Sequence, residues 1–336
     1  MLPAFSFLII AKCREKIWHF RLFLYLCTML TRIFIFAMVA MLAVGCSRER
    51  ALADVNAVYY WRTDLRLDST ERAFLQQHHI KKVYCRYFDV VMGDDGEPRP
   101  NATMTFSDTL PDGIEMVPTV YITEDCMHKP HPGLAAKLVR RILQMNETND
   151  IRGVSEIQID CDYTARSRQT YYDFLTAVAN SSRSTPRFSL LSATIRLHQL
   201  QMPAPPVDYG VLMVYNTGDL RSPQTANSIL DYSDVKPYLR RIDASMLDSM
   251  DFAWPVFGWG VVFDADGRFL RLVPSSALDA DTSAISLREE WGRVDDIQRV
   301  QRRLPARGRH TTILSHLDSP NLSKYTYDEI ESIYSR

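Results

Sequence analysis

Hydrophobic and polar positions alternate with two different periods along the chain after residue 54. Runs in which every second residue is apolar are typical of half-buried β-strands, and apolar residues three and four positions apart indicate helices. Strands are expected at 55–62, 82–91, 115–122, 154–162, 187–194, 207–215, 252–263 and 311–316. Helical spacing follows at 69–75, 134–145, 167–180, 235–242 and 327–334.

This alternation predicts an α/β fold. A strand followed by a helix, repeated about eight times, is typical of parallel βα units, and eight units favour a single (β/α)8 TIM-type barrel over an open sheet. No G-x-G-x-x-G turn follows the first predicted strand, which weakens a dinucleotide-binding alternative, and no cofactor is expected. We therefore expect one barrel domain over residues 55–336, with an insertion after the seventh strand at 264–310.

The first 46 residues have another pattern. Residues 29–32 carry a positive charge, residues 33–43 are mostly apolar, and small residues precede Cys46, which is the three-part order of a signal peptide. The ending Ala43-Val-Gly-Cys46 resembles the lipobox of bacterial lipoproteins. The resemblance implies a presequence over 1–45, a lipidated Cys46 and a tether over 46–54; a plain membrane anchor is the alternative.

Both readings attach the protein to a membrane of the bacterial cell envelope, with its body outside the cytoplasm. Residues 1–28 add further charged and apolar stretches and make the presequence unusually long. Met29 is therefore the expected translation start, and an extended charged region is the alternative.

Composition limits the partners. The chain has 336 residues, 46% of them hydrophobic, and a formal net charge of -1, which is ordinary for a globular protein and gives no basic face for nucleic acid. Asp125, His128 and His131 lie close in sequence, but their prolines indicate a loop without the H-x-x-x-H spacing of helical zinc sites, so no metal is expected. The cysteines after Cys46 are three in number and form no CxxC pair, so buried thiols are expected: Cys85, Cys126 and Cys161.

The fourth predicted strand ends in two acids. Asp160 and Asp162 are two residues apart and share one face of the strand, while Ile159 and Cys161 take the other. Active sites of such barrels lie at the carboxyl ends of the strands, so both acids are expected in the barrel mouth. Two close carboxylates repel and one can stay protonated, which suits acid–base chemistry. A salt bridge to an arginine such as Arg86 is the structural alternative.

Two short fragments resemble motifs of glycoside hydrolase family eighteen, the chitinase family. That family has D-x-x-D-x-D-x-E at the end of its fourth strand, where this chain has Asp160-Cys-Asp162-Tyr-Thr164. It has M-x-Y-D at the end of its sixth, where this chain has Met213-Val-Tyr215-Asn216. The resemblance implies a sugar-hydrolase-like barrel.

The chain departs from both motifs. Thr164 stands where the family has its general-acid glutamate, and a threonine does not protonate a leaving group at neutral pH. Ile157 replaces the first aspartate and Asn216 replaces the sixth-strand aspartate. The resemblance therefore implies the barrel, but not standard chitinase chemistry.

Further candidates flank the predicted mouth. Aromatic rings can stack on the apolar face of a pyranose, and acids, arginines and amides can bind its hydroxyls. The candidate catalytic residues are Asp160 and Asp162. The candidate substrate-binding residues are Tyr60, Arg62, Arg86, Asp89, Glu124, Tyr215, Asn216 and Trp259.

Three functions remain open from the sequence. The first is an envelope lipoprotein that hydrolyses a glycan with Asp160 and Asp162. The second is a related barrel that binds a glycan without cutting it, as Thr164 suggests. The third is a structural lipoprotein in which the acids form salt bridges.

The amino-terminal pattern gives a direct test. We expect the mature protein to begin at a lipidated Cys46, because the charged, apolar and small-residue segments stand in the order that signal peptidases recognise. Mass spectrometry of the membrane fraction measures this. Recovery of an unmodified Cys46 still joined to Gly45 would exclude the lipoprotein reading.

Overall fold

The computed structural model describes residues 55–185, 187–240, 242, 249–274, 286–304 and 310–335. The expected presequence at 1–45, lipidated Cys46 and tether at 46–54 lie outside these residues. Within the described ranges, no helix combines the length and the apolar character needed to cross a bilayer.

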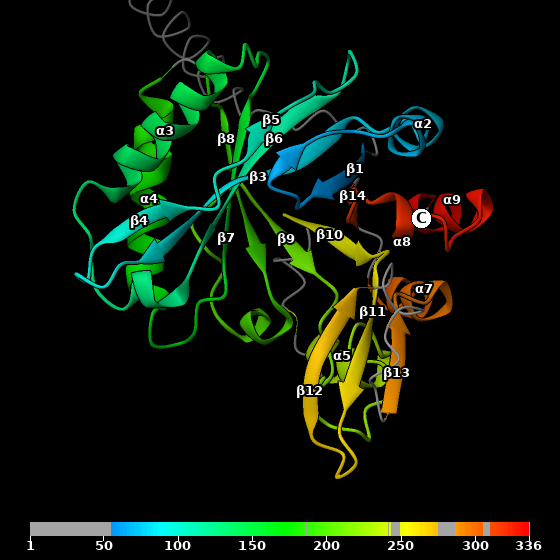
Figure 1. Cartoon of the computed structure of the whole chain (residues 1–336). Coiled ribbons are helices and arrows are strands. Elements are labelled where there is room, and N and C mark those ends of the chain that lie inside the picture. The colour runs from blue at the N-terminus through cyan, green and yellow to red at the C-terminus, as the bar shows by residue number, and fades with distance from the viewer. Residues whose placement is uncertain are drawn as a thin grey trace, which may run out of the picture. The chain divides into compact units, whose positions relative to one another are not determined.

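Eight parallel strands close into a barrel (Figure 1). Neighbouring strands are hydrogen-bonded in the order β1, β14, β10, β9, β8, β7, β6 and β3, and β3 pairs with β1 to complete the ring. This confirms the expected (β/α)8 TIM-type barrel. The strands are β1 (Val55–Tyr60), β3 (Lys82–Met92), β6 (Glu115–Ile122), β7 (Glu156–Cys161), β8 (Leu190–Ile195), β9 (Tyr209–Met213), β10 (Met250–Pro255) and β14 (Thr311–Ser315).

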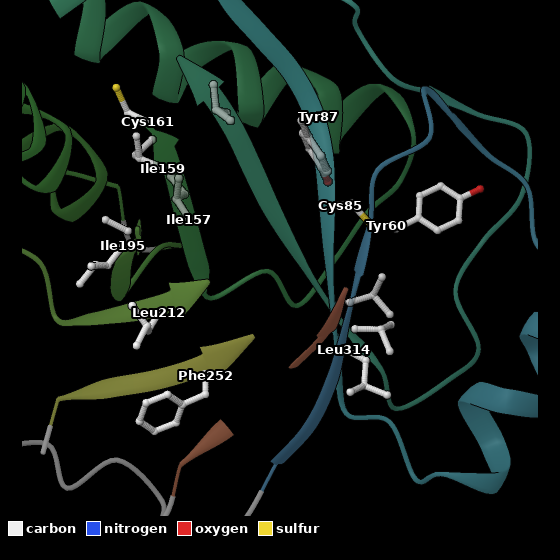
Figure 2. Close-up of a cluster of buried hydrophobic side chains, with 14 of the residues drawn as sticks. Tyr60, Cys85, Tyr87, Ile157, Ile159, Cys161, Ile195, Leu212, Phe252 and Leu314 are labelled. Atoms are coloured by element: carbon white, nitrogen blue, oxygen red, sulfur yellow. The ribbon is translucent and has the colours of Figure 1, made fainter. Parts of the chain in front are cut away.

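Alternate residues of each strand enter two different cores. Ile157, Ile159 and Cys161 of β7 project outward and belong to the large apolar cluster that packs on the helices (Figure 2). A smaller cluster fills the barrel interior and includes Tyr59, Tyr84 and other inward-facing residues: Ala57, Val117, Tyr209, Val211, Met213, Ala253 and Ile313. The period of two predicted from sequence thus separates the two layers.

Helices cover the outer face of the barrel. Helices α3 and α4 lie side by side in Figure 1 and bury their periodic apolar residues, such as Leu138 and Leu175. Helix α2 begins at a capping box in which Asp68 and Glu71 bond each other's backbone N–H groups. The α-helices are α2 (Ser69–Gln77), α3 (Leu134–Thr148), α4 (Arg168–Arg183), α5 (Tyr232–Leu239), α7 (Val294–Gln301), α8 (Ser319–Leu322) and α9 (Tyr327–Tyr334).

Three connections contain short extra segments within the described residues. The short strands β4 (Pro98–Asn101) and β5 (Thr105–Phe106) lie between β3 and β6, and β5 pairs with β2 (Asp64–Leu65). The 3-10 helix η2 (Leu197–Gln201) lies between β8 and β9. Another 3-10 helix, η1 (Glu124–Met127), follows β6. These shorter segments surround the carboxyl ends of β3, β6 and β8.

The expected insertion after the seventh strand is an antiparallel sheet. It consists of β11 (Gly258–Phe263), β12 (Phe269–Pro274) and β13 (Ser286–Trp291), with β11 in the middle. The strand expected at 252–263 is therefore two strands, of which only β10 belongs to the barrel. The chain turns between them at Val256 and Phe257, which alternation alone does not reveal because both residues are buried and apolar.

Charged groups pair at the amino ends of the barrel strands. Lys82 Nζ lies 2.7 Å from Glu156 Oε2 and 3.5 Å from Glu115 Oε2. The other Glu156 oxygen accepts a 2.6 Å hydrogen bond from Ser192 Oγ, and Glu156 is fully buried. A buried carboxylate needs such partners, because burial without them is costly.

This pairing predicts a large stability effect. We expect Lys82→Ala to lower the free energy of unfolding by about 3 kcal/mol, because it leaves the buried Glu156 carboxylate without its cation. Urea unfolding measures the change. Arg152→Ala is the matched control, since Arg152 pairs with Asp150 in water and its loss should cost less than about 1 kcal/mol. Equal losses in the two variants would contradict the assignment.

Candidate active site

A cavity of about 430 Å³ lies at the carboxyl ends of the barrel strands. Its wall combines aromatic rings, two acids, two arginines and a histidine, which is the mixture expected for a site that binds a polar ligand with apolar faces. The lining residues are Trp61, Arg86, Tyr121, Asp160, Asp162, Arg196, Leu197, His198, Met213, Tyr215, Asn216, Thr217 and Tyr238.

Asp160 is the buried acid of the site. It points inward from β7 because it alternates with Ile159 and Cys161, and it is only 5% exposed. Its Oδ1 accepts hydrogen bonds from Thr194 Oγ1 at 2.6 Å and from Arg196 at 2.9 Å. Burial opposes the charge of Arg196, but nearby groups, Asp160 first and Asp162 among the others, together hold the pKa of the guanidinium above its usual range. The two hydrogen bonds fix the Asp160 side chain in the cavity wall.

Asp162 lines the same cavity but has a different environment. Its side chain is 56% exposed, and its ion-pair contact is His198 Nε2 at 3.5 Å, a group that is charged only when protonated. Asp160 and Asp162 both line the cavity at the barrel mouth, as expected from their shared strand face. Their roles differ, because one carboxylate is committed to an arginine and the other is open to a ligand.

Arg86 reaches the cavity with a carboxylate behind it. Its Nε donates a 2.7 Å hydrogen bond to Asp89 Oδ1, and its terminal nitrogen contacts the other oxygen, which raises the pKa of Arg86. A bulge in β3 between Arg86 and Phe88 shifts the alternation by one residue, so residues three apart face the same way. Asp89 is buried and does not line the cavity. Arg86, the suggested partner of the strand-end acids, is thus paired with Asp89, and Asp160 is paired with Arg196.

Glu124 occupies the neighbourhood of the substituted acid position. Thr164 Oγ1 donates a 2.7 Å hydrogen bond to Glu124 Oε1, and Ser167 Oγ donates another at 2.8 Å. These two bonds, Thr164 first, lower the pKa of Glu124. Glu124 is absent from the cavity wall and fixes the turn into α4. It is ionised at neutral pH and does not supply the missing proton donor.

The sixth-strand fragment does reach the cavity. Met213 and Tyr215 point inward while Val214 joins the outer core. Burial raises the pKa of Tyr215, so its hydroxyl stays protonated. Asn216 has a φ of 56°, a left-handed conformation in which asparagine is enriched, and it lines the wall. Asn216 therefore adopts a turn conformation and also provides a side-chain amide that can form hydrogen bonds in the cavity.

A second cavity of about 570 Å³ adjoins the first and shares Trp61, Tyr215 and Asn216 with it. Trp259 of β11 lines it and donates a 2.9 Å hydrogen bond from Nε1 to Glu290 Oε2. Burial lowers the pKa of His316, so this imidazole is neutral. The remaining wall is formed by Phe257, Gly258, Leu272, Val273, Pro274, Ser315, His316, Asp318, Pro320 and Asn321.

Two further expected binding residues, besides Asp89 and Glu124, lie outside both cavities. Tyr60 points outward into the helix-side core, and its hydroxyl donates a 2.7 Å hydrogen bond to the carbonyl of Asp64. Arg62 forms two 2.7 Å bonds with the buried carboxylate of Glu71. The inward residue at the end of β1 is instead Trp61, which stacks on Tyr59 with ring centroids 4.5 Å apart. The correction follows from the alternation of β1.

Sequence reasoning also missed residues on the fifth strand. Arg196 follows Thr194 by two positions and therefore shares its inward face, a signal that the period of two already contained. His198 stands in η2, whose path the sequence pattern did not indicate. Tyr121 lies between Val120 and Ile122 of β6 and lines the cavity, but it is not among the candidates named from the sequence.

No metal-binding arrangement is present among the described residues, where no group of three or more His, Cys, Asp and Glu side chains comes together. His128 contacts Glu124 at 3.3 Å, whereas His131 lies 3.8 Å from Glu97. The three thiols are free and buried, as expected: Cys85, Cys126 and Cys161.

The two acids should respond differently to the same substitution. We expect Asp160→Asn to lower the free energy of unfolding by about 3 kcal/mol, because it leaves the largely buried Arg196 without its carboxylate. Asp162→Asn should change it by less than about 0.5 kcal/mol, because the side chain is exposed. Urea unfolding of both variants measures the difference. A destabilised Asp162→Asn variant would show that this acid is structural.

Comparisons with known proteins agree with the barrel. No protein-family model and no curated protein matches the chain. Solved structures do: the spore cortex-lytic enzyme SleL of Bacillus cereus matches with a TM-score of 0.53, 16% identity, 83% of this chain and 74% of that one. The GH18 chitinase ChiB from the chitin utilization locus of Flavobacterium johnsoniae has a TM-score of 0.50 at 10% identity, covering 85% and 94%. A chitinase from Bacteroides thetaiotaomicron gives 0.50 at 12% identity, covering 84% and 94%. At these identities the chain is similar to glycoside hydrolase family eighteen barrels in fold.

Proposed function

We propose that this protein binds a glycan in the cavity at the carboxyl end of its barrel. The observation that carries the proposal is the cavity wall, in which Trp61, Tyr121 and Tyr215 stand beside Asp162 and Asn216. Aromatic rings can stack on the apolar face of a pyranose, while carboxylate and amide groups bind its hydroxyls. The similar structures bear names of cortex-lytic and chitinase enzymes, which is consistent with a glycan ligand.

The arrangement of the acids favours binding over hydrolysis. Most glycoside hydrolases need a protonated acid beside the leaving group and a second carboxylate across the bond, whereas family-eighteen enzymes are assisted by a group of the substrate. Here Asp160 is held by Arg196, and the position of the acid is Thr164. Glu124, which accepts a hydrogen bond from that threonine, is ionised and does not line the cavity. Of the four candidate acids, Asp89, Asp160 and Glu124 are therefore committed to structural bonds.

Hydrolysis is the second candidate function, and one observation favours it. Asp162 is exposed in the cavity and lies 3.5 Å from His198, so this pair can hold a proton near a bound ligand. An enzyme working in this way would release new reducing ends, and their formation would depend on Asp162. Product analysis beside every binding measurement separates the two functions.

The amino-terminal sequence completes the proposal. A lipid on Cys46 would hold the protein at a membrane of the bacterial cell envelope, with the barrel outside the cytoplasm and in reach of envelope glycans. The support is the signal-peptide order of residues 29–46, which precede the described part of the chain.

The proposal is tested on the mature domain. A glycan array identifies ligands, and isothermal titration then measures Kd. We expect Trp61→Ala to weaken binding at least about tenfold, because Trp61 lines both cavities and its ring supplies the stacking surface. Trp291→Ala is the matched control, since Trp291 is 39% exposed on β13 and lines neither cavity.

The control variant should bind like the wild type. Circular dichroism confirms that both variants are folded. Absence of binding and of hydrolysis across a broad glycan panel would exclude both sugar functions and leave a structural lipoprotein.

A further inference from the structure

The charges around the two cavities do not balance. Arg86 is neutralised by the buried Asp89, and Arg196 by the buried Asp160. Among the described residues that line the first cavity these are the two arginines, and no lysine lines it. Asp162 is a further carboxylate beside these pairs: its charge helps to hold the pKa of Arg196 high, but Arg196 hydrogen-bonds Asp160, and the ion-pair contact of Asp162 is the His198 imidazole at 3.5 Å.

The second cavity repeats this imbalance. Asp318 lines it and accepts a 2.7 Å hydrogen bond from Asn321 Nδ2, a neutral group. His316, the titratable neighbour on the same wall, is half-buried, and the loss of solvent lowers its pKa. No lysine or arginine is among the described residues that line this cavity. Among the described residues, with Asp89 behind Arg86 counted, each cavity therefore has one carboxylate more than it has arginines and lysines.

We propose that the glycan carries free amino groups, so that the ligand is an amino-sugar oligosaccharide with unacetylated, protonated nitrogens. This inference rests on the proposed glycan-binding function and specifies its ligand class. An ammonium group placed in the first cavity would face Asp162, and one on a neighbouring sugar would face Asp318.

The aromatic wall supports the same ligand. Trp61 and Tyr215 are shared by the two cavities, so an oligosaccharide that spans both passes these rings. An ammonium over the face of an indole or phenol ring is attracted by the negative face of the ring. The two carboxylates and the two rings thus attract positive charge along one path.

Other ligand classes fit less well. An acidic glycan would meet Asp162 and Asp318, and it would find the guanidinium groups of Arg86 and Arg196 already paired with buried carboxylates. A neutral, fully acetylated glycan could still stack on Trp61 and donate hydroxyl hydrogen bonds to the two acids, but it would gain no charge attraction from them. Glycans of the same length and linkage should therefore differ in affinity according to their charge.

The test compares two probes that differ only in their nitrogen substituents. They are the β-1,4-linked tetrasaccharide of glucosamine and its fully N-acetylated counterpart, titrated at a pH where the amine is protonated. We expect the free-amine tetrasaccharide to bind the wild-type domain more tightly. We also expect its advantage to shrink at high salt, because ions screen the attraction between exposed charges.

Variants locate the effect. Asp162→Asn should weaken binding of the free-amine probe about fivefold, as for the loss of one partly exposed ion pair, and should affect the acetylated probe less, because the new amide still accepts hydrogen bonds from sugar hydroxyls. Asp318→Asn should act in the same direction. Asp112→Asn is the matched control, because Asp112 is an exposed acid outside both cavities, and it should change neither affinity.

The outcomes separate this inference from the function on which it rests. Equal affinity for the two probes overturns the amino-sugar assignment and leaves glycan binding intact, as does an Asp162→Asn variant that weakens both probes equally. Binding restricted to neutral or acidic members of a wider panel overturns it as well. Failure of every glycan to bind rejects the proposed function together with the inference.

Discussion

The structure depends on how the closed barrel accommodates the polar side chains of β7 and of the residue that follows it. These are the carboxylates of Glu156, Asp160 and Asp162 and the amide of Gln158. Glu156 and Asp160 point inward with Gln158 between them, because every second residue of a strand enters the interior. Each must have a partner, since a lone buried charge is costly. Lys82 and Ser192 donate hydrogen bonds to Glu156 at the amino end of the strand. Thr194 and Arg196 donate hydrogen bonds to Asp160 at the carboxyl end. The carboxylates of β7 therefore explain the polar residues Lys82 of β3 and Ser192 and Thr194 of β8, and Asp162, two residues after Asp160, is the acid exposed in the cavity.

Most of the fold could be predicted from the sequence because the barrel repeats a local rule. The strand at 115–122 and the helix at 327–334 were placed with the observed bounds, and the outward packing of Ile157, Ile159 and Cys161 followed from alternation alone. Alternation did not reveal where the chain leaves the barrel, because no polar residue marks that point. Val256 and Phe257 are buried in a turn, so the barrel strand and the first strand of the inserted sheet merged into one prediction at 252–263.

The site was predictable only in part, and the reason is again alternation. Asp160, Asp162, Tyr215 and Asn216 were placed at the cavity because their strands are regular. Asp89 could not be placed from a period of two, because the bulge in β3 inserts a residue before it. Tyr60, expected at the site, takes the face of β1 opposite to that of Trp61, which lines the cavity. The inward direction of Arg196 follows from the period of two, but its pairing with Asp160 depends on which strand lies beside β7, and no single segment carries that information.

The substitution at position 164 changes more than one catalytic group. A glutamate there would stand against Glu124, and two carboxylates at hydrogen-bond distance repel unless one is protonated. A threonine removes that repulsion and donates a hydrogen bond, so Glu124 remains an anion that fixes the start of α4. Thr164 and Glu124 are thus one structural unit, and restoring an acid at 164 alone would break it. Asp162 is more than half exposed and lines a cavity whose wall also contains aromatic rings, so recognition of a positively charged sugar suits it better than protonation of a leaving group.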